Sequence, residues 1–109
     1  MNENFVGLST EMALDRKSHG TVSFSDDVLK KISEIAASKI DGVVNIQIPE
    51  IKKEELQIQI SLSTTLVYKT SLFDIAKNIQ DEVQKSLQYM TGLEVVSVDV
   101  NVRALKIAD

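Results

Sequence analysis

The chain has 109 residues, 43% of them hydrophobic, and a formal net charge of −4, which fits one globular domain with a core. It contains no cysteine, and this excludes disulfide frameworks, thiolate zinc sites and cysteine nucleophiles. An acidic surface does not attract phosphate backbones, so we expect no nucleic-acid partner.

No apolar run approaches the roughly 20 residues that a membrane helix needs, and the first residues do not resemble a secretory signal. We therefore expect a cytoplasmic protein. We also expect a flexible N-terminal tail, residues 1–19, followed by a single domain, residues 20–109. His19 is the only histidine. No recognisable constellation of Asp and Ser surrounds it, so an exposed loop residue is predicted rather than a base or metal ligand.

A short strand is expected over residues 21–24, followed by a helix. Ser25 has a residue type preferred at a helix N-cap, and Asp26 and Asp27 would lie at the positive end of the helix dipole. The next apolar residues recur at helical spacing and form one stripe. They are Val28, Leu29, Ile32, Ile35, Ala36 and Ile40. The pair Asp41-Gly42 predicts the end of this helix.

Alternation of apolar and polar residues predicts two strands next. The first covers residues 44–48, and Pro49 is expected to end it because proline lacks a backbone donor. Residues 49–54 would then be a charged hairpin connection. The second strand covers residues 56–62 and is expected to continue toward Leu66.

A second helix is predicted over residues 71–90. Ser71 and Asp74 resemble a capping box, and Gly92 favours the left-handed conformation of a helix C-terminus. The last strand covers residues 94–105. Here Val96, Val98, Val100 and Val102 alternate with Ser97, Asp99, Asn101 and Arg103. A period of two places these four valines on one buried face.

The expected order is therefore β-α-β-β-α-β. Each strand has one apolar face and each helix one apolar stripe, which predicts an α+β two-layer sandwich with both helices on one face of a mainly antiparallel sheet. Right-handed crossovers would make the fold ferredoxin-like. A KH-like arrangement, with the first strand absent or detached, uses the same elements, and both stay open.

The chemistry-bearing residues do not form a recognisable active site. The acidic pairs Asp26-Asp27 and Glu54-Glu55 are explained by a helix cap and a turn. The four glycines are isolated and form neither a nucleotide-binding loop nor the G-x-x-G loop of a KH domain. We predict no catalytic residue, no cofactor and no metal site, and hence a protein that is not an enzyme.

The polar face of the sheet is the candidate interaction surface. Its predicted members are Asn45, Gln47, Gln57, Gln59, Ser61, Ser97, Asp99, Asn101 and Arg103. Most are uncharged amides or hydroxyls, which both donate and accept hydrogen bonds and could satisfy one another across an interface. Such a face is more typical of an assembly component than of an enzyme.

Three segments resemble the alkaline shock protein family, also linked to general stress proteins of Gram-positive bacteria. They are TVSFSDDVLKKISEIAASKIDGVVNI (21–46), LQIQISLSTTLVYKTSLFDIAKNIQDEVQKSL (56–87) and MTGLEVVSVDVNV (90–102). The chain departs from the family in two places. A glycine-rich insertion is replaced by residues 49–54, and a Tyr-Gly pair appears as Tyr68-Lys69.

The resemblance implies a non-enzymatic scaffold or adaptor in cell-envelope stress homeostasis, which self-associates as a homo-oligomer or binds a protein partner. It also implies association with the inner membrane face through a separate anchoring protein. The alternative is a regulatory module that modulates a metabolic enzyme such as acetyl-CoA carboxylase. Its candidate surfaces are the N-terminal tail and the outer face of the second helix, with Lys77, Gln80, Asp81, Gln84 and Gln88.

Overall fold

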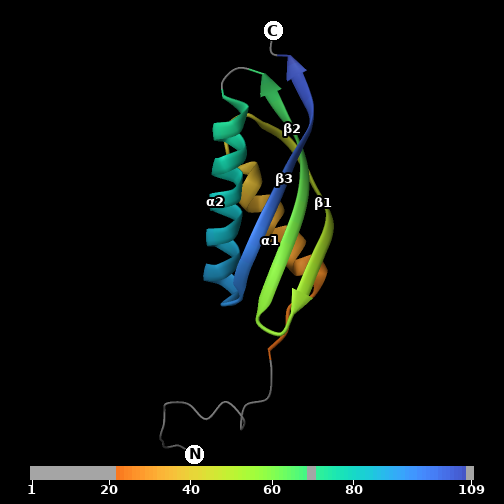
Figure 1. Ribbon diagram of the computed structural model, residues 1–109, viewed down its shortest axis with the longest axis vertical. Helices are drawn as coiled ribbons and strands as arrows, with labels where there is room; N and C mark the ends of the chain where they lie inside the picture. The colour runs from red at the N-terminus through yellow and green to blue at the C-terminus, as the bar shows by residue number, and fades with distance from the viewer. Residues whose placement is uncertain (1–21, 69–70, 108–109) are drawn as a thin grey trace, which may run out of the picture.

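The computed structural model describes residues 22–68 and 71–107, which form two helices and a three-stranded sheet (Figure 1). The elements are α1 (Asp26–Ser38), β1 (Val43–Glu54), β2 (Gln57–Tyr68), α2 (Leu72–Thr91) and β3 (Glu94–Ile107). The strand order is β1-β2-β3. Strand β1 pairs with β2 antiparallel, and β3 pairs with β2 in parallel. The predicted tail and His19 lie outside the described residues.

The predicted α+β two-layer class is confirmed, but two details of the prediction are wrong. Residues 22–24 of the expected first strand adopt no regular structure. The sheet is mixed rather than mainly antiparallel, because α2 connects two parallel strands that are direct neighbours. A ferredoxin-like sheet would place the first strand between them. Here β3 pairs with β2 along its length, so no strand lies between them. The described sheet therefore corresponds to the KH-like alternative, in which the first strand is absent or detached.

The core is built on one face of the central strand β2. Every second residue from Ile58 to Leu66 is at most 1% exposed. The helices contribute their apolar stripes to the same cluster, which contains Leu29, Ala36 and Ala37 of α1 and Ile75, Ile79, Val83 and Leu87 of α2. Both helices therefore cover the same side of the sheet, and the opposite side carries no described element.

Three helix ends confirm the predicted caps, whereas α1 ends at Ser38 with Lys39 as its C-cap, before the predicted Asp41-Gly42. The Ser25 hydroxyl accepts a hydrogen bond from the Val28 N–H at 3.3 Å, and the Ser71 hydroxyl accepts one from the Asp74 N–H at 3.3 Å. Gly92 follows α2 in the left-handed conformation, with φ 75°. These local interactions satisfy backbone groups that have no partner inside the helix.

Strand β1 continues through Pro49, which was expected to end it. The register shift between Gln47 and Glu50 leaves Ile48 and Pro49 together opposite Leu62. Proline is tolerated here because β1 is an edge strand and the position is a bulge. The predicted connection over residues 49–54 is therefore part of the strand, and the turn to β2 consists of residues 55–56.

Strand β3 contains a similar irregularity at Val96, which was predicted on the buried face. The pairing steps from Ile58–Val95 to Gln59–Ser97, so Val96 is an extra residue. Val95 is consequently 3% exposed and Val96 is 48% exposed. The alternation resumes after the bulge, which places Val98, Val100 and Val102 on the helix side, as predicted.

Gly42 offers a test of how tightly the α1–β1 connection packs. It has φ 98°, and a Cβ atom there would lie 3.1 Å from Cδ1 of Ile75. We expect Gly42→Ala to lower the free energy of unfolding by roughly 2 kcal/mol, because left-handed strain and a steric clash add.

The matched control is Gly92→Ala, where φ is 75° and no atom lies within 4 Å of the added Cβ. Backbone strain alone should cost about 1 kcal/mol there. Urea unfolding of both variants provides the comparison. Equal losses at the two positions would contradict the packing argument.

Candidate functional site

The polar face of the sheet is assembled by the strand register. On β2, the residues between the core positions point away from the helices. Across the ladder, Ser63 pairs with Gln47 of β1 and Asn101 of β3. The same register brings together eight of the nine predicted side chains, namely Asn45, Gln47, Gln57, Gln59, Ser61, Ser97, Asp99 and Asn101. We call the sheet surface that carries them the open face.

Arg103, the ninth predicted residue, occupies a bulge of β3. The pairing steps from Thr64–Val102 to Thr65–Ala104, so Arg103 is the extra residue at this point. Its side chain is exposed. It therefore lies at the edge of the open face, not in its ladder of paired residues.

The register also adds residues to the open face that the sequence reasoning missed. Ser63 and Thr65 continue its central row, and alternation along β2 could have identified them. Glu50 and Lys52 pair with Ser61 and Gln59. The sequence does not predict them because Pro49 and the charged residues after it are typical of a connection, whereas β1 continues to Glu54. The open face thus has hydroxyls and amides at its centre and charged residues on both outer strands.

The open face has the chemistry of a recognition surface. Its amides and hydroxyls can donate and accept hydrogen bonds without the desolvation cost of a charge. The Gln57 side-chain amide already donates to a carboxylate oxygen of Glu94 at 3.2 Å. In the described part of the chain, no group of three or more His, Cys, Asp or Glu side chains could hold a metal ion.

The acidic pair at the start of α1 has the structural role predicted for it. Asp26 and Asp27 lie in the first turn of the helix, and a carboxylate oxygen of Asp26 lies 2.9 Å from Nζ of Lys53. The same ammonium group donates to the backbone oxygen of Phe24 at 3.0 Å. This exposed ion pair connects β1 to the N-terminus of α1, a position that favours negative charge.

Three glutamines of α2 bond the outer edge of β3. The side-chain amides of Gln80 and Gln84 donate to the carbonyls of Val98 and Val95, at 3.0 and 3.3 Å. The Val95 N–H donates to the side-chain oxygen of Gln88 at 3.2 Å. An edge strand leaves such groups without partners. These glutamines were considered part of a free helix surface, and they instead bond within the chain.

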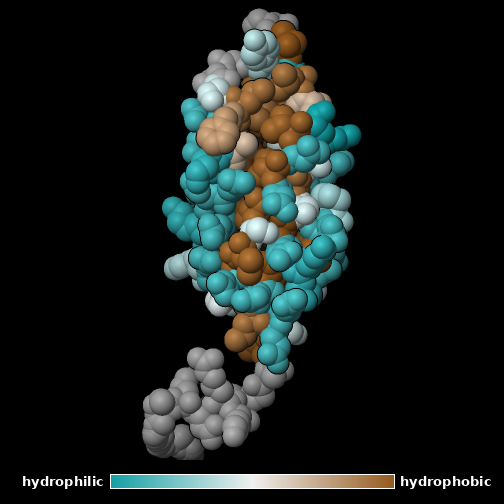
Figure 2. All heavy atoms as spheres, viewed as in Figure 1, coloured by the Kyte–Doolittle hydropathy of each residue, from teal (hydrophilic) through white to brown (hydrophobic). Residues whose placement is uncertain are grey.

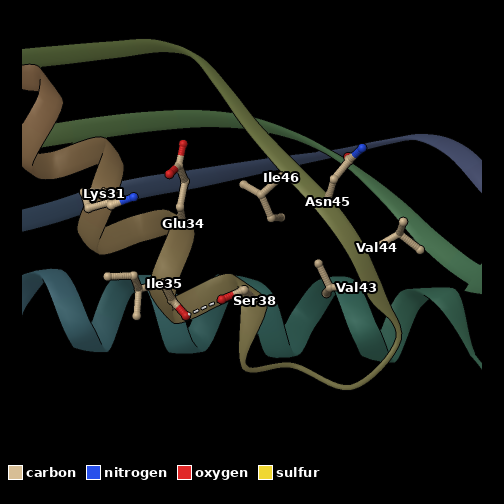
Figure 3. Close-up of a pocket in the computed structure, with 8 residues that line it drawn as sticks. All are labelled: Lys31, Glu34, Ile35, Ser38, Val43, Val44, Asn45 and Ile46. Atoms are coloured by element: carbon tan, nitrogen blue, oxygen red, sulfur yellow. Dashed lines mark hydrogen bonds between the residues drawn. The ribbon is translucent and has the colours of Figure 1, made fainter.

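A shallow groove of about 360 Å³ lies between α1 and β1 (Figure 3). Val43 and Ile46 point toward α1, whereas Asn45 points away from it, onto the open face. The Ser38 hydroxyl donates back to the carbonyl of Ile35 at 2.9 Å, so it is engaged within the helix. Lys31 and Glu34 are the charged residues that line the groove. The groove therefore resembles a packing interface between α1 and β1 more than a reaction site.

Neither of the two described helices is both long enough and apolar enough to span a membrane.

Comparison with known proteins identifies the family. The model of the alkaline shock protein 23 family, described as having a cell envelope-related function, matches residues 50–107. An uncharacterized protein of Streptococcus pyogenes serotype M6 is 25% identical over 108 residues, which cover 81% of this chain and 89% of that protein.

Solved structures share the fold at low sequence identity. A MamM CTD variant with three substitutions has a TM-score of 0.54 and 15% identity, over 73% of this chain and 95% of that chain. The nickel form of another MamM CTD variant gives the same TM-score and identity, over 73% and 99%. These similarities support the two-layer α+β architecture.

The glutamine bonds to β3 can be tested by substitution. Gln88→Ala would leave the Val95 N–H without its partner. We expect a loss of about 1 kcal/mol in unfolding free energy, and hydrogen exchange at the Val95 amide that is faster by several-fold. Asn78→Ala, at an exposed position of the same helix, is the control. Unchanged exchange at Val95 in Gln88→Ala would show that the bond contributes nothing.

Proposed function

Because the chain belongs to the alkaline shock protein 23 family, which has a cell envelope-related function, we propose that it is a non-enzymatic scaffold or adaptor. In this proposal it self-associates and binds a protein partner in cell-envelope homeostasis under stress. The open face is the surface that receives the partner.

The observation that carries this proposal is the chemistry of the open face. Its rows on β2 and β3 combine mainly amides and hydroxyls with two carboxylates, Glu94 and Asp99, and no described element covers them. A flat surface with many donors and acceptors fits a protein interface, where hydrogen bonds form roughly every 100–200 Å².

Association with the inner face of the membrane belongs to the same proposal. Neither described helix could span a bilayer, so we propose that a separate anchoring protein holds the chain there. In this proposal the anchoring protein binds the open face. The cytoplasmic location follows from this role.

A regulatory module for a metabolic enzyme such as acetyl-CoA carboxylase has weaker support. Its candidate surface on α2 is largely engaged within the chain. Gln80, Gln84 and Gln88 bond β3, and Lys77 forms an ion pair with Asp81 at 3.3 Å. A partner at this surface would have to displace bonds that stabilise the edge of the sheet.

The proposal is tested by altering the open face without altering its shape. Gln59→Glu combined with Gln47→Glu keeps both side chains nearly isosteric but removes two amide donors and adds two charges, away from the outer edge of β3. We expect capture of the native partner from the source cells to fall by at least tenfold, because buried carboxylates would lack donors.

The control for this experiment is Lys85→Glu, which changes the net charge by the same amount on the exposed surface of α2. It should leave capture at the level of the unsubstituted chain. Equal capture by all three proteins would contradict the assignment of the open face. Loss of capture with Lys85→Glu alone would favour a partner that docks on α2.

A further inference from the structure

The glutamine bonds protect only the first part of the outer edge of β3. The residues whose side chains face the helices also direct their backbone N–H and C=O groups outward, as the bonds at Val95 and Val98 show. Val100 and Val102 are the next residues in this series. In the described chain, no side chain of α2 bonds the edge beyond Val98. The outward backbone N–H and C=O groups of Val100 and Val102 are therefore available to another strand.

The lengths of α2 and β3 explain why the protection stops. At 1.5 Å per residue, the 20 residues of α2 span about 30 Å. At 3.3 Å per residue, the 14 residues of β3 span about 46 Å. The end of β3 extends past the start of α2 (Figure 1). Leu105 and Ile107 on this extension are 45% and 65% exposed, and Figure 2 shows an apolar band along this side of the molecule.

Two opposite charges of β3 lie at equal distances on the two sides of Asn101. Val100 and Val102 flank it, and beyond them lie Asp99 on one side and Arg103 on the other. The two charged side chains are exposed. Their positions are four residues apart along the strand, a distance of about 13 Å, so they cannot pair with each other within one chain. In an antiparallel pair of β3 strands centred on Asn101, each Asp99 would stand opposite the other copy's Arg103.

We propose that the occupant of this edge is a second copy of the chain, whose β3 pairs antiparallel with the first around a two-fold axis at Asn101. This inference specifies the surface for the self-association in the proposed function, and it rests on that part of it. The outward backbone groups of Val100 and Val102 bond those of the symmetry-related Val102 and Val100. The pairing covers residues 99–103 of each copy, beyond the stretch of edge that the three glutamines bond, and it joins the two three-stranded sheets into one sheet of six strands.

Charge complementarity is the reason for choosing a second copy over an unrelated strand. A two-fold axis at Asn101 creates two Asp99–Arg103 pairs at once and places the two Asn101 amides side by side, where each can donate and accept. Opposite charges directly across an antiparallel pair stabilise it, and like charges destabilise it. The open face of each copy stays free for the protein partner, since the contact lies along its edge.

The test is a charge exchange in the full chain, followed by light scattering over a concentration series. Asp99→Arg places two arginines opposite each other, and Arg103→Asp places two aspartates there. Each substitution alone should weaken dimerisation about tenfold or more, because two favourable pairs become two repulsive ones. Circular dichroism checks that both variants fold, which their exposed positions favour.

Two complementary measurements isolate the pairing. An equimolar mixture of the single variants should form one-to-one heterodimers, because every cross-strand contact is again Arg to Asp. The double variant with Asp99→Arg and Arg103→Asp should recover self-association. Rescue in both cases supports antiparallel pairing at Asn101, since a merely structural role for either residue would not produce it.

The opposite results separate this inference from the proposed function. A dimer that none of the substitutions weakens, or that neither combination restores, overturns the β3 pairing and leaves self-association to another surface. An unsubstituted chain that stays monomeric at every concentration overturns both the pairing and the self-association. Partner capture through the open face would be unaffected by either outcome.

Discussion

The burial of one face of β2 is the constraint on which the rest of the structure depends. This strand has neighbours on both edges, and its core-facing side chains from Ile58 to Leu66 are at most 1% exposed. A shift of one residue would turn these side chains out and bring Gln59 and Ser61 into the core. The same alternation that fills the core therefore determines the composition of the open face.

The elements with strong local signals could be predicted from the sequence. The caps at Ser25, Ser71 and Gly92 and the helical spacing of apolar residues each depend on neighbours a few positions away. Strand β2 was equally clear because its alternation is uninterrupted. Where the sequence signal was short, as over residues 21–24, the described residues 22–24 form no strand.

The errors arose where tertiary pairing overrides a local rule. Pro49 would interrupt a central strand, but it is accommodated by a bulge on an edge strand. Val96 belongs to an alternating series, but the bulge beside it transfers the buried position to Val95. Neither bulge could be inferred without knowing which strands are neighbours. The roles of Gln84 and Gln88 could not be inferred from the sequence either. Their positions on the polar side of a helix are typical of solvent-exposed residues, although both bond β3.

The central claim is that the open face is accessible in the isolated chain and becomes covered by a protein partner. NMR with a soluble paramagnetic probe tests it directly on the side-chain amides of Gln47, Gln57 and Gln59, which lie away from the outer edge of β3. The account predicts strong signal loss at these amides in the isolated chain, and protection of the same amides when the partner is added. Amides that are already protected in the isolated chain, or that stay fully accessible in the complex, would contradict it.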